Sequence, residues 1–413
     1  MKENKKYAWV VVGLLWFVAL LNYMDRQMLS TMKPAMEIDI QELKSATNFG
    51  YLMAVFLWIY GLMSPVSGII ADKLNRKWLI VGSLLVWSLV TFLMGYAASF
   101  NQIYWLRALM GLSEALYIPA GLSLIADYHD SKTRSLAIGI HMTGLYMGQA
   151  LGGFGATVAA KFSWQATFHS FGFVGIVYAV ILLFFLKEKK NQPAAVHSST
   201  TSEQKKTSLW KGLAFLLGNL SFWVILIYFA VPSLPGWATK NWLPTLFAGN
   251  LHIDMAQAGP ISTITIAVSS FFGVLFGGIL SDRWVQKNIK GRVYTSAIGL
   301  ALTVPSLLLI GFGSSIYSVV GAAFCFGFGY GMFDANNMPI LCQFVPARYR
   351  ATAYGLMNMT GVFAGAFITN LLGKSSDEGI LGKDFAMLSL IVLIALVIQL
   401  YYLRPKFNDF EGA

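Results

Sequence analysis

Charged residues are scarce in this chain. Only 12% of its residues are aspartate, glutamate, lysine or arginine, whereas 56% are hydrophobic. A typical soluble domain has about 25% charged residues, so this composition excludes a soluble globular protein. Apolar stretches long enough to cross about 30 Å of hydrocarbon recur along the whole length. The sequence therefore predicts an all-α membrane protein embedded in a lipid bilayer.

Cysteines, histidine clusters and nucleotide-binding loops are also lacking. Cys325 and Cys342 are the only two cysteines, and we expect them to pack within one span without forming a disulfide. The five histidines are scattered over separate spans and loops, so no metal site is predicted. No Gly-x-x-x-x-Gly-Lys-(Ser/Thr) loop occurs. An intramembrane enzyme needs a nucleophile with its base or clustered metal ligands; we therefore expect no enzyme activity, no cofactor and an ion gradient as the energy source.

Twelve apolar segments are long enough to span a membrane as helices. They are placed at 8–30, 48–70, 78–98, 102–126, 136–160, 165–186, 218–247, 258–281, 293–312, 315–342, 352–373 and 384–403. A polar, Ser/Thr-rich stretch with several lysines follows the sixth segment and predicts a flexible linker. The expected organisation is an N-terminal six-helix half at 1–186, a cytoplasmic linker at 187–212 and a C-terminal six-helix half at 213–413.

Two short patterns recur about half the chain apart. The pattern Gly-x-x-x-Asp-(Lys/Arg) occurs at 68–73 and again at 278–283. The pattern Arg-x-x-Ala-x-Gly occurs at 134–139 and again at 350–355, each time after a proline and a loop. Internal repeats of this length are typical of secondary transporters built from two halves.

The formal net charge of +11 is distributed unevenly. If both termini are cytoplasmic, most lysines and arginines fall on cytoplasmic loops and tails, as the positive-inside rule requires. These loops face anionic lipid headgroups, so nucleic acid is not expected as a partner. The predicted external loops are short and hold no Asn-x-(Ser/Thr) acceptor site, which favours a bacterial inner membrane.

Four ionisable residues lie in or at the ends of apolar runs, where each costs roughly 2.5–3.5 kcal/mol on insertion scales. Asp25 and Arg26 are adjacent in the first run, and Arg107 and Glu114 are separated by seven residues in the fourth. Seven helical residues turn about 700°, so Arg107 and Glu114 share one face. Two acid/base pairs buried in an apolar chain predict a proton-coupled path for an anion.

Two further ionisable residues fall in later spans and are additional site candidates. Lys240 follows two prolines that predict a kink, and it is either an external gate, a second anion contact or an ordinary interfacial lysine. Asp334 in the tenth span either faces a cavity as a proton or cation site or is satisfied by Asn336 and backbone groups.

The segment from Gly68 through Asp72 to Lys77 resembles the loop signature between helices 2 and 3 of the major facilitator superfamily. Asn75 stands where that signature has a glycine. The resemblance implies the twelve-helix major facilitator fold, alternating access and a monomer. It also implies a cytoplasmic gate, for which the candidates are Asp72, Arg76, Asp282 and Arg283.

Three motifs are similar to those of the anion:cation symporters, which include carriers of hexuronates, galactonate and sialic acid. They are the Asn-Tyr-x-Asp-Arg run ending at Arg26, the Arg107-x6-Glu114 spacing and the segment 241–245. Spinster-type lysolipid transporters share the first two, whereas the Gly-rich run from 355 onward is more like the symporters. Antiporters of the superfamily usually have a proline where Gln149 stands, which favours symport. Leu145 replaces a polar residue found in many sugar-acid carriers, a departure that counts against a highly hydroxylated substrate.

The resemblance assigns proton coupling to Asp25 and Glu114. We expect Arg26 to contact the substrate and Arg107 to lie nearer Asp25, although the two arginines can exchange these roles. Unprotonated acids would pair with the arginines, and protonation of one acid would free a guanidinium for a carboxylate. Further candidates for substrate binding are Tyr23, Tyr60, Gln149 and Asn358. The predicted function is proton-coupled symport of a small organic anion such as a sugar acid; the alternative is a spinster-type proton-linked lysolipid transporter.

Overall fold

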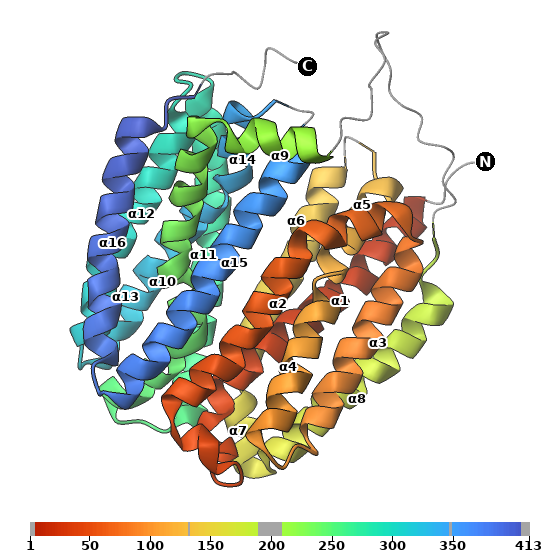
Figure 1. Cartoon of the computed structure of the whole chain (residues 1–413), viewed down its shortest axis with the longest axis vertical. Helices are drawn as coiled ribbons and strands as arrows, with labels where there is room; N and C mark the ends of the chain where they lie inside the picture. Colours follow the sequence, from red (N-terminus) through yellow and green to blue (C-terminus); the bar gives the residue numbers. More distant parts are fainter. Residues whose placement is uncertain (1–4, 131–132, 189–208, 347–348, 406–413) are drawn as a thin grey trace.

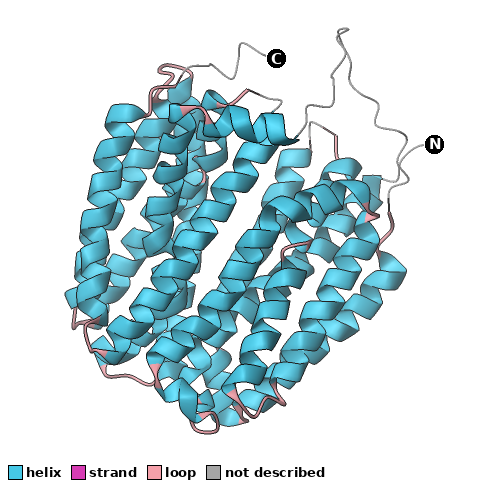
Figure 2. Cartoon of the chain, viewed as in Figure 1, coloured by secondary structure: helices cyan, strands magenta, loops and turns pink. Residues whose placement is uncertain are grey.

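The computed structural model describes residues 5–130, 133–188, 209–346 and 349–405, which are helical apart from short turns (Figure 2). One 3-10 helix, η1 (Gln41–Lys44), accompanies the α-helices. The α-helices are α1 (Lys5–Met36), α2 (Ala46–Lys73), α3 (Arg76–Met94), α4 (Phe100–Glu114), α5 (Tyr117–Tyr128), α6 (Arg134–Gly152), α7 (Gly155–Lys161), α8 (Trp164–Phe185), α9 (Leu209–Leu217), α10 (Leu220–Leu251), α11 (Met255–Val285), α12 (Gly291–Phe312), α13 (Ile316–Asp334), α14 (Asn337–Phe344), α15 (Arg350–Asp377) and α16 (Leu381–Tyr402).

Short polar side chains set the starts of several helices. The side chains of Asn75, Ser99 and Ser163 each accept a hydrogen bond from a backbone amide in the first turn of α3, α4 and α8. Such caps satisfy amides that have no partner inside the helix. They explain why the predicted and observed helix starts differ by only a few residues.

Within the described residues, eleven helical segments are long and apolar enough to cross a membrane. Three of the twelve expected spans are made of two helices each, namely α4 with α5, α6 with α7 and α13 with α14. The α6–α7 span is the one that the eleven do not include. The predicted all-α membrane class is confirmed, and the interruptions within three spans are new information.

The helices lie in two groups side by side. Figure 1 shows α1 to α8, coloured red to yellow, on one side and α10 to α16, coloured green to blue, on the other. Most of the predicted linker at 187–212 lies outside the described residues, and its last residues begin α9. We call the end of the bundle where α1 begins and α16 ends the terminal end, and the opposite end the distal end.

A carboxylate at the distal end holds the two groups together. Asp377, the last residue of α15, accepts hydrogen bonds from the Ser45 hydroxyl at 2.8 Å, the Ala46 amide at 2.6 Å, the Thr47 amide at 2.9 Å and the Thr47 hydroxyl at 2.7 Å. These donors form the first turn of α2, whose orphan amides are satisfied by a carboxylate. We call this contact the distal latch.

A second distal contact joins α6 and α11. The Thr263 hydroxyl donates to the Ala150 carbonyl at 3.1 Å. Gly153 and Gly259 lie backbone to backbone, because a Cβ atom on either would overlap the carbonyl oxygen of the other. Glycine at both positions is what allows this close approach.

Candidate functional site

The centre of the N-terminal group of helices contains a buried ion pair. The Arg26 Nε in α1 donates to the Glu114 Oε2 in α4 at 2.5 Å. The Asn22 side-chain amide donates to the same oxygen at 3.0 Å. Asn22 and Arg26 are four residues apart and therefore lie on one face of α1. Glu114 has no exposed surface, so its charge depends on these two donors.

Aromatic rings surround the two guanidinium groups of this region. The Arg26 guanidinium carbon lies 5.1 Å from the centre of the Tyr23 ring, 4.9 Å from that of Phe56 and 4.6 Å from that of Tyr60. The Arg107 guanidinium carbon lies 4.5 Å from the centre of the Phe56 ring. Phe56 therefore contacts both cations, and cation–π attraction holds the arginines in place without using their hydrogen bonds.

Asp25 and Arg107 are both buried, but they do not form the ion pair that the sequence predicted. Asp25 accepts a hydrogen bond from the Thr91 hydroxyl of α3 at 3.3 Å. The Arg107 Nη1 contacts the Met110 sulfur at 2.8 Å, a weak acceptor. The two residues interact electrostatically, but among the described ion pairs Arg26 with Glu114 is the one within this cluster. Arg107 is the arginine that interacts with Asp25, whereas Arg26 pairs with Glu114; the predicted roles of the two arginines stay predictions.

Several buried polar atoms in this cluster have no hydrogen-bond partner in the described structure. They are Asn22 Oδ1, Asp25 Oδ1, Arg26 Nη2, Arg107 Nε and Glu114 Oε1. Buried polar groups are costly when unsatisfied, so such a gathering marks a place for water, a proton or a ligand. The two free guanidinium N–H groups are donors that suit a carboxylate.

Lys240 and Asp334 form a second polar group in the C-terminal set of helices. The Lys240 ammonium lies 4.8 Å from the centre of the Trp237 ring, and its backbone carbonyl accepts a hydrogen bond from Gln27 at 2.8 Å. Asp334 accepts from the Asn337 amide at 3.0 Å and interacts electrostatically with Lys240. Asn336 donates instead to the Met332 carbonyl, so the predicted Asn336 partner is wrong and Asn337 takes its place.

Asp334 also has exposed surface although it lies in the middle of a span. Tyr354 of α15 is likewise 44% exposed. Tyr354 and Asp334 interact electrostatically, so these two exposed residues of α15 and α13 belong to one polar region.

The remaining predicted binding residues are dispersed. Tyr23 and Tyr60 lie beside Arg26, as described above. Asn358 of α15 donates to the Ser64 hydroxyl of α2 at 2.9 Å and so bridges the two groups of helices. Gln149 is buried in α6, and none of its described contacts ties it to the arginines. Sequence reasoning missed Thr91 and Phe56 as site residues; Phe56 had a signal, because it lies one helical turn before Tyr60.

The predicted cytoplasmic gate is only partly described. The side chains of Asp72 and Lys73 lie outside the described part of the structure. Arg76 pairs with Asp127, and Asp282 lies 3.7 Å from Arg292, so each ion pair stays within its own group of helices. Arg283 is exposed. The gate role of these residues stays a prediction.

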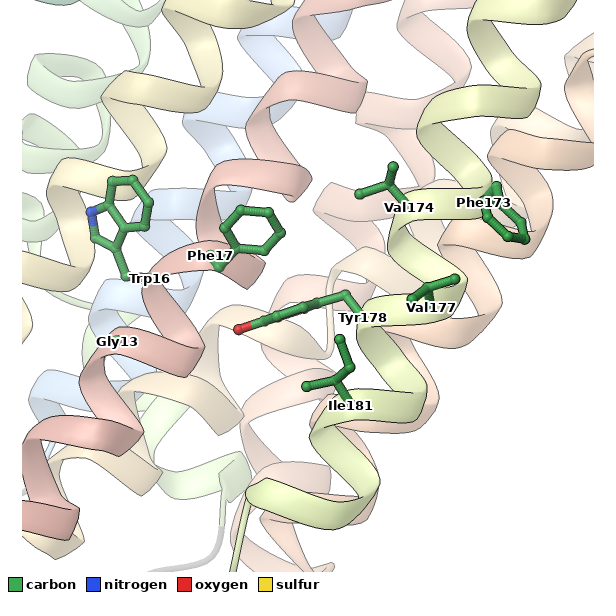
Figure 3. Close-up of a pocket in the computed structure, with 8 residues that line it drawn as sticks. All are labelled: Gly13, Trp16, Phe17, Phe173, Val174, Val177, Tyr178 and Ile181. Atoms are coloured by element: carbon green, nitrogen blue, oxygen red, sulfur yellow. The ribbon is translucent and has the colours of Figure 1, made fainter.

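Figure 3 shows a separate groove of about 530 Å³ between α1 and α8. Trp16 and Phe17 line it from α1, and Phe173 and Val177 line it from α8. Its lining holds no charged residue, and the Tyr178 hydroxyl donates to the Leu14 carbonyl at 2.8 Å. This groove suits an acyl chain and offers nothing that would bind an anion.

Comparisons with known proteins place this arrangement in context. The chain is 22% identical over 412 residues to the uncharacterized transporter YybO of Bacillus subtilis, covering 96% of this chain and 94% of that protein. It is 24% identical over 425 residues to the hexuronate transporter of Escherichia coli strain K12, covering 98% and 96%. The crystal structure of a bacterial homolog to the human lysosomal transporter Spinster, inward-facing and unoccupied, has the same fold, with a TM-score of 0.80, 18% identity and coverage of 96% and 97%.

A family model agrees with these relatives over most of the chain. The model of the Major Facilitator Superfamily matches residues 15–369. The match begins in α1 before the Arg26 cluster and ends in α15 beyond Asn358. This family consists of transporters, and its members are not enzymes. The chain belongs to the Major Facilitator Superfamily and is an integral membrane transporter.

Proposed function

We propose that this transporter is a proton-coupled symporter of a small organic anion, such as a sugar acid. The observation that carries the proposal is the pair of buried, unpartnered guanidinium donors, Arg26 Nη2 and Arg107 Nε, beside two buried carboxylates. A substrate carboxylate can accept from these donors and so remove their desolvation cost. The similarity to a hexuronate transporter supports a carboxylate substrate.

The charges of the cluster explain why a proton should accompany the anion. With Asp25 and Glu114 ionised, the two arginines are balanced and an anion gains little. Glu114 is held by Arg26 and Asn22, whereas Asp25 has only the hydrogen bond from Thr91 and one unpartnered oxygen. Protonation of Asp25 leaves the cluster with one excess positive charge, which a single carboxylate neutralises. The loaded carrier is then neutral and can rearrange at low cost in a low-dielectric interior.

The membrane and the orientation complete the proposal. The basic residues of the polar loops support cytoplasmic termini. A bacterial inner membrane, a proton gradient as energy source and a monomeric carrier fit the same picture. No nucleic acid partner is proposed.

A second candidate is proton-linked transport of a lysolipid. The apolar groove between α1 and α8 favours it, because an acyl chain fits there while a headgroup contacts polar residues. The groove lining holds none of the four charged residues of the Arg26 cluster, so a lipid would need a lateral path to the cluster. We therefore place the small anion first.

Ligand binding to the purified transporter tests the proposal. Thermal stability is measured with glucuronate, galactonate, sialic acid and lysophosphatidylcholine at acid and neutral pH. Stabilisation by a small anion that is stronger at acid pH supports symport, because binding of proton and anion must be reciprocally linked. Stabilisation only by the lysolipid would replace the proposal with the second candidate.

A further inference from the structure

The two halves carry equivalent carboxylates at equivalent breaks. Glu114 is the last residue of α4 and Asp334 is the last residue of α13. A short break follows each of them, and a second helix, α5 or α14, then completes the span. Each carboxylate stands five residues before a proline, Pro119 or Pro339. Asp334 is therefore the counterpart of Glu114 in the second half.

The cations are equivalent as well. The helices α1 and α10 are each 32 residues long and are the first long helices of their respective halves. Arg26 lies ten residues before the end of α1, at Met36, and Lys240 lies eleven residues before the end of α10, at Leu251. Each half thus supplies one cation from its first helix and one carboxylate from its interrupted helix.

The two cations belong to helices that contact each other across the interface between the halves. Gln27, the neighbour of Arg26, donates to the Lys240 carbonyl at 2.8 Å and fixes α1 against α10 at this level. Lys240 interacts electrostatically with both Arg26 and Asp334. An anion at Arg26 would therefore also interact with Lys240.

The two carboxylates differ in one respect. Glu114 is fully buried and held by an ion pair, whereas Asp334 has exposed surface. Asp334 has one described hydrogen bond, from Asn337. The titratable groups that interact electrostatically with it are Lys240 and Tyr228 of α10, Tyr23 of α1, Tyr146 of α6, Tyr330 of α13 and Tyr354 of α15. Lys240 is the cation among them, so Asp334 is the group that neutralises it.

We propose that Lys240 and Asp334 form a second anion subsite, and that the substrate is a short organic dianion whose two acidic groups contact Arg26 in one half and Lys240 in the other. This inference rests on the proposed function. Protonation of Asp334 leaves the charge of Lys240 unbalanced, as protonation of Asp25 leaves one excess positive charge in the Arg26 cluster, so two protons accompany two negative charges. A substrate held by both halves also draws them together, which couples binding to the conformational change.

Two matched pairs of probes test the inference in proteoliposomes. Glucarate differs from glucuronate by a second carboxylate on the same carbon chain, and succinate differs in the same way from butyrate. Counterflow with each probe is measured for the wild type, Lys240→Gln and Asp334→Asn. Lys383→Gln is the control, because Lys383 is an exposed lysine of α16 at the distal end.

The wild type should prefer the dianion of at least one pair by about tenfold, the value of one charged hydrogen bond. Lys240→Gln should remove this preference and Lys383→Gln should keep it. Asp334→Asn should keep the preference and make it less dependent on pH, because Lys240 then has no carboxylate to neutralise it at any pH. If monoanions are transported without a dianion preference, or if the preference survives Lys240→Gln, this inference fails and the proposed function stands. If the wild type transports none of the four anions, the proposed function fails as well.

Discussion

The Arg26 guanidinium lies 2.5 Å from the Glu114 carboxylate and makes its ion pair with α4, far along the chain. Asp25, next to Arg26 in the sequence, contacts Thr91 on α3 instead. Successive residues on a helix point about 100° apart, so these two neighbours are directed towards different helices. The side chains of Asp25 and Arg26 therefore contact different helices although the two residues are adjacent in the chain.

Replacement of Arg26 by glutamine should abolish anion binding and lower stability. Glu114 would remain buried without its cation, which costs about 3–5 kcal/mol. The double variant Arg26→Gln with Glu114→Gln should regain most of this stability without regaining binding. Thermal unfolding with and without the anion measures both effects. Arg404→Gln, which changes an exposed arginine after α16, serves as control; wild-type affinity in Arg26→Gln would rule out this residue as the substrate contact.

Replacement of Asp25 by asparagine should uncouple transport from the proton gradient. Asparagine imitates the protonated acid, so anion exchange across the membrane should persist while accumulation driven by an imposed pH gradient is lost. Thr91→Val removes only the hydrogen bond to Asp25 and should keep coupling. Proteoliposome uptake with and without a pH gradient distinguishes the two. Full gradient-driven accumulation by Asp25→Asn would show that another group carries the proton.

Replacement of Asp377 by alanine should open the distal end. The variant loses the acceptor of four hydrogen bonds from Ser45, Ala46 and Thr47, and bonds to a charged group contribute about 1.5–3 kcal/mol each. Spin labels at Glu42 and Lys383, in a background without the two cysteines, should report a longer distance. Asp384→Ala is the matched control, because Asp384 bonds Ser375 within the same half. An unchanged distance distribution would mean that other contacts keep this end closed.

Replacement of Gly153 by alanine should force α6 away from α11. The added methyl group would overlap Gly259 and Thr263, an overpacking that costs about 1–3 kcal/mol. Gly139 lies in α6, the helix that Gly153 caps, and has open space around its Cα, so Gly139→Ala should be tolerated. Thermal unfolding and the distance between the spin labels measure the difference. Equal behaviour of the two variants would contradict the close approach seen here.

The fold was predictable because hydrophobic segment length and internal repeats depend on the local sequence. The breaks after Glu114 and Asp334 were not, because each lies inside a continuous apolar run and depends on packing between spans. The charged residues of the site were also predictable from the local sequence, because ionisable residues are rare within apolar spans.

The partners of these charged residues were less accessible from sequence. Thr91 gave no signal, because a threonine in an apolar helix commonly bonds to its own backbone. The distal latch gave none either, since Asp377 binds backbone amides at the start of α2 and lies beyond the predicted span 352–373. Contacts between distant helices depend on how the helices pack in space, and no local sequence pattern predicts that packing.

The backbone crossing of Gly153 and Gly259 has a mechanical consequence. Because no side chain separates the two backbones, α6 can pivot at this point and rotate as a rigid helix. The terminal end of α6, at Arg134, lies roughly 28 Å away at 1.5 Å per residue. A rotation of about 10° at the crossing then displaces that end by roughly 5 Å, about one helical turn. A small hinge at two glycines is therefore enough to move the far end of the helix by the length of a side chain.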